Sequence, residues 1–155
     1  MKNKSFYLPR YDTDKYCWLQ FKGENVFQYL DKHFIGTPMS ARWVSPDTIS
    51  IEDGEYADFI HWWPSNIVIS ERANLLLQPL FTDTCEIFPF VKLKGSIQYY
   101  VVNVLNIVDC LDLEKSDILI RRDGSVRRVE KYVFNKKKLP NSLIFKIPQY
   151  TNVIF

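Results

Sequence analysis

The chain has 155 residues, of which 46% are hydrophobic and 15% aromatic, and this composition excludes a disordered or fibrous protein. Its formal net charge of +2 is too small to indicate a nucleic-acid-binding protein by itself. Cys17, Cys85 and Cys110 lie far apart and form no Cys-x-x-Cys pair, so we expect buried, reduced thiols rather than a redox or zinc site.

The N-terminal stretch MKNKSFYLPRYDTDKY begins with basic residues but reaches Pro9, Arg10 and Asp12 before any apolar segment forms, which argues against a secretory signal. The most apolar stretch, YYVVNVLNIVDCL, is interrupted by polar residues and is too short to span a bilayer. No low-complexity linker divides the sequence. We therefore expect one domain over residues 1–155, located in the cytoplasm and without a membrane partner.

The first half of the chain contains two strand signals and one helix signal. Alternation of apolar and polar residues in YCWLQFK predicts a strand over residues 16–22, and the β-branched run TISIEDG predicts another over 48–54. Between them, NVFQYLDKHFIG has apolar residues near helical spacing, and Gly36 is placed to end a helix. We expect this helix over about residues 25–35.

A strand that runs directly into a helix is predicted around residues 64–78. The apolar run at 66–69 is extended, and Ser70 follows it as a good N-cap. Glu71 lies in the first turn, where the helix dipole favours a carboxylate. We expect the helix over residues 70–78, with Pro79 ending it.

The second half of the chain predicts two hairpins. CEIFPFVKL and IQYYVVNVLNIV flank a short Gly-containing loop at residues 94–96, and Pro89 places the first of these strands at an edge or a bulge. In DILIRRDGSVRRVEKYVF, Asp123-Gly124 separates two alternating runs and predicts a type I′ turn. The fold class is therefore α+β, a mostly antiparallel sheet with few helices.

The sequence contains none of the common catalytic or cofactor-binding motifs. His33 and His61 belong to no His-Glu-x-x-His or His-x-Glu motif, and no nucleophile elbow, Walker loop or Gly-x-Gly-x-x-Gly occurs. We expect His33 on a helix surface and His61, beside WWP, as a packed or interfacial imidazole. We predict that the protein is not an enzyme and has no cofactor or metal, with a hydrolase of unrecognised site as an open alternative.

Charge is strongly polarised along the chain. Residues 43–71 carry six acidic residues and no Lys or Arg, whereas residues 121–138 carry eight Lys and Arg against two acids, a net charge of +6. Either block is explained by a solvated face or by a charged hairpin that protects a sheet edge. The acidic block, with its interleaved aromatic residues, also suits docking of a basic partner. The basic hairpin at 121–138 also suits a nucleic-acid-associated module, which we keep as the alternative function.

Two longer patterns resemble a bacterial immunity-protein family of polymorphic toxin systems, formerly catalogued as a domain of unknown function. The first is SNIVISERANLLL, in which an apolar strand runs into Ser-Glu-Arg and a helix, and the second is VDCLDLEKS at residues 108–116. LIFKIPQYTNVIF is similar to the closing strand of the family. The resemblance covers residues 58–155.

The resemblance implies a cytoplasmic antitoxin that binds one cognate secreted toxin domain and neutralises it by stoichiometric occlusion, without catalysis. The residues that match the family pattern are Ser70, Glu71, Asp109, Asp112 and Ser116, and a cap or a turn explains each of them physically. We predict that the toxin contacts the acidic-aromatic stretch from Glu52 to Trp63, through Glu52, Asp53, Glu55, Asp58, Trp62 and Trp63.

The last residues, TNVIF, echo SNIVI at 65–69, but the sequence stops where the earlier copy continues into a helix. Members of the family usually continue there into a second Ser-Glu and helix. A strand ending at Phe155 without that helix would leave apolar surface exposed. Either the chain is a shortened member, or other elements fill that place, or a partner covers it.

Overall fold

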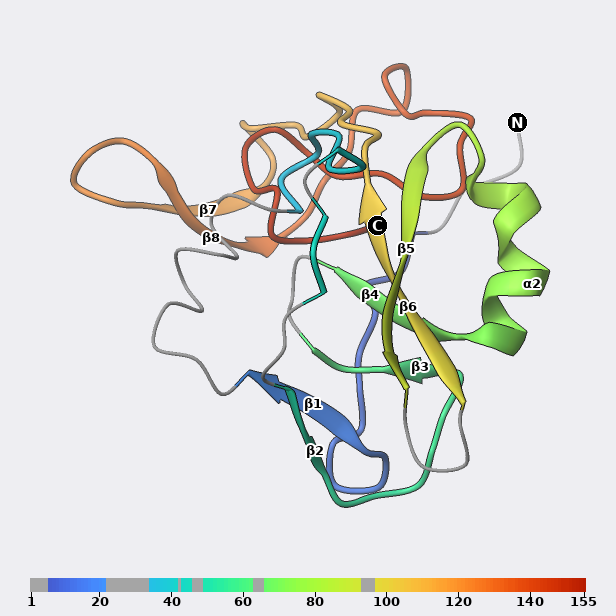
Figure 1. Ribbon diagram of the computed structural model, residues 1–155. Helices are drawn as coiled ribbons and strands as arrows, with labels where there is room; N and C mark the ends of the chain where they lie inside the picture. The colour runs from blue at the N-terminus through green and yellow to red at the C-terminus, as the bar shows by residue number, and fades with distance from the viewer. Residues whose placement is uncertain (1–5, 22–33, 42, 46–48, 63–65, 93–96) are drawn as a thin grey trace.

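The structure is a computed structural model that describes residues 6–21, 34–41, 43–45, 49–62, 66–92 and 97–155 (Figure 1). Its elements, in chain order, are β1 Trp18–Phe21, β2 Ile49–Glu52, β3 Phe59–Ile60, β4 Ile67–Ser70, α2 Glu71–Phe81, β5 Cys85–Lys92, β6 Gln98–Val104, β7 Asp117–Ile120 and β8 Val126–Lys131. All pairings between these strands are antiparallel. The predicted α+β class with few helices is confirmed, while the helix predicted over 25–35 falls on residues 22–33, outside the described part.

A four-stranded sheet with the order β3-β4-β6-β5 forms the centre of the molecule (Figure 1). Its inner strands β4 and β6 are mostly apolar because residues on both of their faces are buried; the exceptions are Ser70 at the end of β4 and Gln98 and Asn103 in β6. Val68 and Val101, which are paired across the two strands, pack against the aromatic cluster on one face. Ile69 and Val102 face the other side, where α2 and the C-terminal segment cover the sheet.

Helix α2 begins directly after β4, as predicted. Ser70 is its N-cap, and its Oγ accepts a hydrogen bond from the backbone N–H of Ala73 at 3.2 Å. The prediction that Pro79 ends the helix is wrong, because α2 continues to Phe81. Proline lies here in the last turn, where it removes only one intrahelical hydrogen bond, and the hydroxyl of Thr82 caps the carbonyl of Gln78 at 3.0 Å.

The two predicted hairpins are present as β5–β6 and β7–β8. Strand β5 lies at the sheet edge and its register shifts between Pro89 and Val91, so both placements predicted for this proline are correct. The prediction of a type I′ turn at Asp123-Gly124 is wrong. Gly124 has a φ of 82°, but Asp123 does not share its positive φ, and the N–H of Gly124 donates to the carbonyl of Arg121 at 3.0 Å. This is a three-residue loop whose last residue is left-handed.

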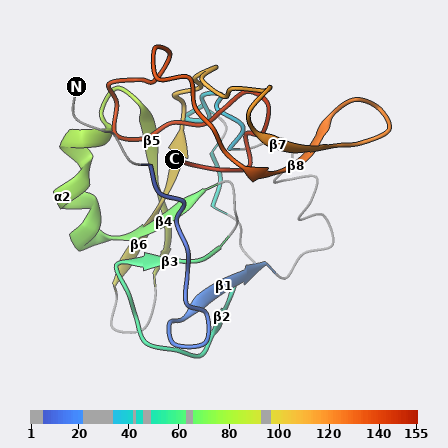
Figure 2. The same cartoon turned by 180° about the vertical axis from the view of Figure 1, so that it is seen from behind.

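Strands β1 and β2 form a separate two-stranded sheet, and the segment before β1 joins it to the central sheet. Figure 2 shows this N-terminal segment running past the C-terminus and down to β1. The backbone of this segment and of β1 is held against the residues on either side of β3: the N–H of Cys17 donates to the carbonyl of Glu55 at 3.0 Å, and the N–H of Leu19 in β1 donates to that of His61 at 2.8 Å. The end of this segment and the start of β1 therefore pair along the β3 edge of the central sheet.

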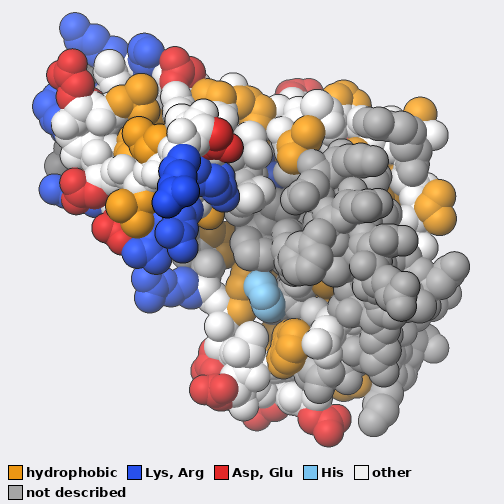
Figure 3. Space-filling view, turned by 90° about the vertical axis from the view of Figure 1, so that its left-hand side faces the viewer, with side chains coloured by type: hydrophobic (Ala, Val, Ile, Leu, Met, Phe, Trp, Pro, Cys, Tyr) orange, Lys and Arg blue, Asp and Glu red, His pale blue; other side chains and the backbone are white. Residues whose placement is uncertain are grey.

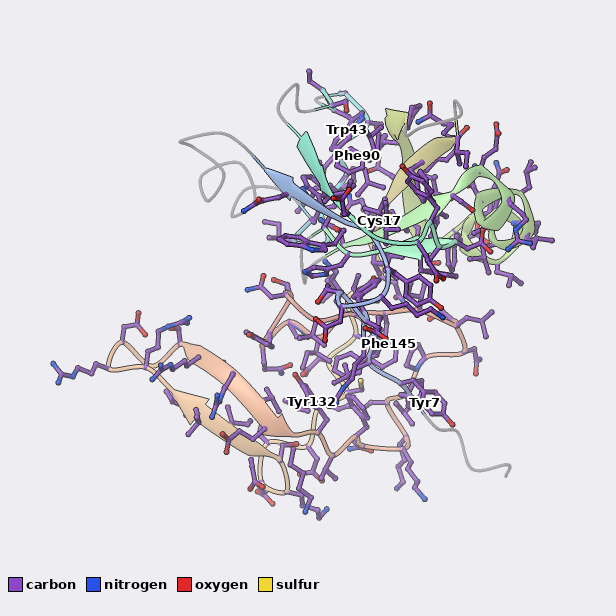
Figure 4. All side chains as sticks on the ribbon, turned by 90° about the horizontal axis from the view of Figure 1, so that it is seen from below. Tyr7, Cys17, Trp43, Phe90, Tyr132 and Phe145 are labelled. Atoms are coloured by element: carbon purple, nitrogen blue, oxygen red, sulfur yellow. The ribbon has the colours of Figure 1, made fainter. Side chains whose placement is uncertain are left out.

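Residues after β6 form a second hydrophobic cluster around Phe145, separate from the aromatic cluster of the sheet. Figure 4 shows Trp43, Phe90 and Cys17 together in the first cluster and Tyr132 with Phe145 in the second. TNVIF is not a strand of a sheet, but Phe155 exchanges two backbone hydrogen bonds with Phe145 and is buried. The apolar residues at the end of the sequence are therefore covered by other elements of the chain.

Candidate functional site

Four exposed carboxylates from two distant segments meet at one end of the molecule. The N–H of Glu55 donates to the carbonyl of Lys15 at 3.0 Å, and this contact brings residues 12–15 beside residues 53–55. We call the group formed by Asp12, Asp14, Asp53 and Glu55 the acidic corner; all four are exposed. In Figure 3 acidic side chains gather at this lower end, whereas Lys and Arg concentrate in the upper part. Acidic and basic residues are thus separated on the surface as they are along the sequence.

The backbone of the acidic corner is tightly fixed although its side chains are exposed. Asp12 Oδ1 accepts the N–H groups of Asp14 and Lys15, each at 3.2 Å, and so caps a turn. A Cβ on Gly54 would lie 2.3 Å from the backbone nitrogen of Cys17, so no other residue fits there without a shift of the backbone. The backbone that carries these four carboxylates is therefore fixed by a capped turn and by close packing.

Asp58, beside the acidic corner, is engaged within the protein. Its carboxylate accepts a hydrogen bond from the Ser70 hydroxyl at 2.6 Å and from Arg72 Nε at 3.2 Å, and it forms an ion pair with the same guanidinium. The hydrogen bond from Arg72, followed by that from Ser70, lowers the pKa of Asp58. Asp58 therefore ties the start of α2 to β3 and contributes less free charge to the surface than the four corner residues.

A pocket of about 500 Å³ opens next to the acidic corner, between the N-terminal segment and β3. Its lining includes Pro9, Tyr11, Asp12, Phe59 and His61. The rings of Tyr11 and His61 lie 5.1 Å apart. Burial raises the pKa of Tyr11 to about 12 and lowers the pKa of His61, so both side chains are neutral at pH 7. In Figure 3 the pale-blue side chain is His61, because His33 is not described.

A second pocket of about 250 Å³ lies beside the first, and Pro9, Tyr11 and His61 line both. The C-terminal residues 152–154 form its other side. Asn66 also lines this pocket; its side chain is only 3% exposed. Among the described residues, neither Nδ2 nor Oδ1 of Asn66 has a hydrogen-bond partner, and the same is true of His61 Nδ1. The two pockets are thus lined mainly by apolar surface, as binding sites generally are.

The larger pocket also contains Cys17, so we asked whether it suits nucleophilic catalysis. Burial raises the pKa of the Cys17 thiol, which is the opposite of the activation that a nucleophilic cysteine needs. The carboxylate of Asp58, which also lines this pocket, already accepts hydrogen bonds from Ser70 and Arg72. Among the described residues no three His, Cys, Asp or Glu side chains are grouped to hold a metal ion. The described lining therefore shows neither an activated thiol nor a group of metal ligands.

The residues predicted to contact a toxin fall into three groups. Asp53 and Glu55 are in the acidic corner, with Asp58 beside it. Trp62 is only 4% exposed and packs with its ring 4.3 Å from that of Phe90, so it offers a partner almost no surface. The side chain of Glu52, at the end of β2, and the whole of Trp63 lie outside the described residues.

The five residues that match the family pattern take part in caps and turns or lie beside them. Ser70 and Glu71 are the N-cap and the first residue of α2. Asp109 accepts a hydrogen bond from Gln149 Nε2 at 2.7 Å. The carbonyl of Asp112 accepts the N–H of Ser116 at 3.0 Å, and the Ser116 hydroxyl accepts the N–H of Val133, also at 3.0 Å. These contacts join the turn at 112–116 to the chain after β8.

The basic hairpin β7–β8 extends away from the rest of the chain (Figure 1). Part of its charge is used internally, since Arg121 Nη1 donates to the carbonyl of Val126 at 2.8 Å and Arg128 forms an ion pair with Glu130. Arg122 and Arg127 are exposed. The hairpin therefore has the exposed cationic side chains of a phosphate-binding surface, but fewer free charges than its sequence indicates.

The sequence did not identify Asn66, Tyr11 or the N-terminal acids as site residues. Asp12 and Asp14 reach the acidic corner only through the pairing of residues 15–17 with Glu55, which no local pattern signals. Asn66 precedes a buried strand, and its missing hydrogen bonds are visible only in three dimensions. For His61 the sequence indicated a packed or interfacial imidazole, and the side chain is half-buried at a pocket wall.

Comparison with known families decides what kind of protein carries this site. The sequence profile of the immunity protein family Imm11 matches residues 45–155, which is more than half of the chain and includes β3, α2 and both hairpins. The chain belongs to the Imm11 immunity protein family. The resemblance noted from the sequence alone is thereby confirmed. None of the curated proteins matches this Imm11 chain. Within its described residues, no helix has the length and apolar character needed to cross a membrane.

The matched region and the N-terminal segment contribute differently to the candidate site. Asp53, Glu55, His61, Asn66 and residues 152–154 lie within the Imm11 match, whereas the pocket walls formed by residues 8–13 precede it. Immunity protein families act in general through a toxin partner rather than through catalysis. The two pockets and the acidic corner are parts of the described chain that could meet such a partner.

Proposed function

We propose that this Imm11 protein binds and neutralises one cognate secreted toxin domain, in the cytoplasm and by stoichiometric occlusion. The observation that carries the proposal is the acidic corner, which lies beside the larger of two neighbouring, mainly apolar pockets on a chain of the Imm11 family. Apolar pockets inside a charged rim are typical of interface hot spots, and complementary charge speeds and orients association. The partner surface that fits is basic around an apolar projection.

The toxin contact is centred on Asp53 and Glu55. Both side chains are exposed, and the nearest ion pair, between Lys15 and Glu55, is long at 3.8 Å and leaves the carboxylate accessible. An exposed pair of this kind contributes little to the stability of the fold, so these acids are free to meet a partner. Of the residues predicted for this surface, Trp62 is left out because it is buried in the aromatic cluster.

The test is calorimetric titration of the purified chain with the C-terminal domain of the large secreted protein encoded beside it. We expect one-to-one binding in the nanomolar range and loss of the toxic activity of that domain. The double variant Asp53→Lys, Glu55→Lys should weaken binding at least tenfold at low salt, mainly through a slower association rate. The matched control is Glu114→Lys, Asp117→Lys, two exposed acids elsewhere on the chain, which should leave affinity within twofold.

Two results would contradict the proposal. Absence of binding by the folded wild-type chain would refute the antitoxin function for that toxin. Equal affinity of the wild type and the Asp53→Lys, Glu55→Lys variant would refute the acidic corner as the contact surface. A charge-dependent interface also predicts that the difference between these two proteins shrinks as salt is added.

The alternative function, a nucleic-acid-associated module, is favoured by one observation, the exposed Arg122 and Arg127 on the projecting hairpin. Its affinity for duplex DNA, measured by fluorescence anisotropy, should fall steeply with salt and with substitution of these two arginines. Binding to DNA that is unaffected by the double variant Arg122→Gln, Arg127→Gln would refute this alternative.

A further inference from the structure

A groove with a tyrosine-rich lining lies beside the acidic corner. It has a volume of about 670 Å³, and Tyr16, Tyr56 and Tyr99 line it together with Ile97. Tyr56 directly follows Glu55 of the acidic corner in the chain. Tyr56 is 42% exposed and Ile97 is 39% exposed, so both present accessible surface to another molecule. We call this feature the tyrosine groove.

The shape of the tyrosine groove is fixed by hydrogen bonds within the protein. Tyr99 is 1% exposed, and its hydroxyl donates to the carbonyl of Ala57, the residue after Tyr56, at 2.7 Å. On the other side of Tyr56, the carbonyl of Glu55 accepts the N–H of Cys17 at 3.0 Å. The backbone on both sides of Tyr56 is therefore held in place before a partner arrives, which lowers the conformational cost of binding.

The charges of the tyrosine groove favour a cationic occupant. Its charged lining residues are Asp58, Glu71 and Arg72. Arg72 is already engaged, because its guanidinium pairs with the carboxylate of Asp58. Glu71 is exposed, and within the described part of the chain its side chain forms no ion pair. The free charge of the lining is therefore negative, and the neighbouring acidic corner adds to it. An anion would meet Asp58 and Glu71 at the start of α2, which argues against a phosphate or a carboxylate in the groove.

The tyrosine rings supply a second attraction for a cation. The face of a tyrosine ring attracts an ammonium or guanidinium group that lies within about 6 Å of the ring centre. The free protein contains such a contact at Tyr16, because Lys15 Nζ lies 4.9 Å from the centre of its ring. Among the described residues, Tyr56 has no cation over its ring and no aromatic neighbour. The same kind of contact is therefore open to a partner at Tyr56.

We infer that a lysine or arginine side chain of the bound toxin domain lies in the tyrosine groove, with its cation over the ring of Tyr56 and its charge opposed by Glu71. This rests on the proposed function and names the kind of side chain that the site recognises. The occupant comes from the toxin domain because Tyr56 adjoins Glu55, one of the two acids at the centre of the proposed contact. A guanidinium suits the groove especially well, since it can stack on a ring and pair with a carboxylate at the same time.

The discriminating variants are Tyr56→Phe and Tyr56→Leu. Phenylalanine keeps the aromatic face, whereas leucine keeps an apolar side chain without it. In calorimetric titration with the toxin domain, Tyr56→Phe should bind within about twofold of the wild type, and Tyr56→Leu roughly 5- to 30-fold more weakly. Because Tyr56 is exposed, both variants should unfold at the wild-type temperature. The matched control is Tyr7→Leu, at a tyrosine that is 79% exposed and outside the groove, and it should leave the affinity unchanged.

The charge of the occupant is tested by Glu71→Gln, which keeps the size of the side chain and removes its charge. The affinity for the toxin domain should fall about two- to fivefold at low salt. This difference should shrink as salt is added, because the interaction is between exposed charges. The matched control is Asp83→Asn, at an exposed acid just beyond the other end of α2, which should bind the toxin domain as the wild type does.

The outcomes separate this inference from the proposed function. Wild-type affinity of the Tyr56→Leu variant would overturn the cationic contact and leave the antitoxin function standing, whereas a wild-type chain that does not bind would overturn both. Equal losses in Tyr56→Phe and Tyr56→Leu would also overturn it, because the hydroxyl and not the ring face would then make the contact. If Tyr56→Leu does not fold, Glu71→Gln decides the question. Unchanged affinity of that variant at low salt would overturn the inference, and a salt-dependent loss would support it.

Discussion

Lys146 is fully buried, and its titration makes a testable contribution to stability. Its side chain has no exposed surface, and its Nζ donates a hydrogen bond to the backbone carbonyl of Phe34. Burial lowers the pKa of Lys146 to about 7, against about 10.4 for an unperturbed lysine. Between pH 7 and pH 10 the unfolded chain therefore binds more protons at this residue than the folded chain. The contribution of Lys146 to the free energy of unfolding must then rise with pH in this window and be constant below it.

The size of the effect follows from the two pKa values. With a folded pKa of about 7, raising the pH from 7.0 to 8.5 should increase the contribution of Lys146 by about 1.6 kcal/mol. The measurement is urea unfolding of the wild type and of Lys146→Met at several pH values in this range. Subtracting the two curves cancels most of the contribution of the cysteine thiols, whose raised pKa values act in the opposite direction above about pH 8.5.

The matched control is Lys137→Met, which removes a lysine that is exposed on the surface. Its difference from the wild type should be nearly independent of pH between 7.0 and 8.5. A pH-independent difference between the wild type and Lys146→Met would refute the reasoning, because it would mean that Lys146 keeps its full charge in the folded protein.

Three other substitutions test the framework around the candidate site. Ser70→Ala removes the N-cap of α2 and the hydrogen bond to Asp58 and should destabilise the fold by about 1–2 kcal/mol in urea unfolding; no change would show that the cap is replaced. Gly54→Ala places a Cβ 2.3 Å from the nitrogen of Cys17 and should cost about 2–3 kcal/mol, whereas an unchanged unfolding midpoint would show that the N-terminal segment moves freely. Phe155→Ala empties part of the C-terminal cluster and should cost about 3–5 kcal/mol by the same assay; a cost below 1 kcal/mol would refute its place in the core.

The elements predicted correctly from the sequence are those with short-range signals. Helix α2 was found because its cap, first-turn acid and apolar run are adjacent in the chain, and both hairpins were found because glycine-containing loops separate their strands. The errors are also local: a proline in a last helical turn costs less than one in the middle, and Asp-Gly is compatible with more than one loop type.

The candidate site was only partly predictable because its walls come from segments distant in sequence. Asp53 and Glu55 were selected for their charge, but their neighbours Asp12 and Asp14 join them through pairing across about forty residues. The sequence did not distinguish a buried from an exposed Trp62, because aromatic residues have the same composition signal in a core and in an interface. No sequence pattern marks Asn66 as a site residue.

The fixed glycine between two free carboxylates has a consequence for how this surface can evolve. Gly54 admits no side chain, whereas Asp53 and Glu55 on either side of it point away from the core and touch little of it. Substitutions at the flanking positions change the charge offered to a partner at almost no cost to stability. Under the proposed function, one or two surface changes on an unaltered backbone would then be enough to alter which toxin is bound. Among related sequences we expect position 54 to stay glycine while positions 53 and 55 diverge with the toxin.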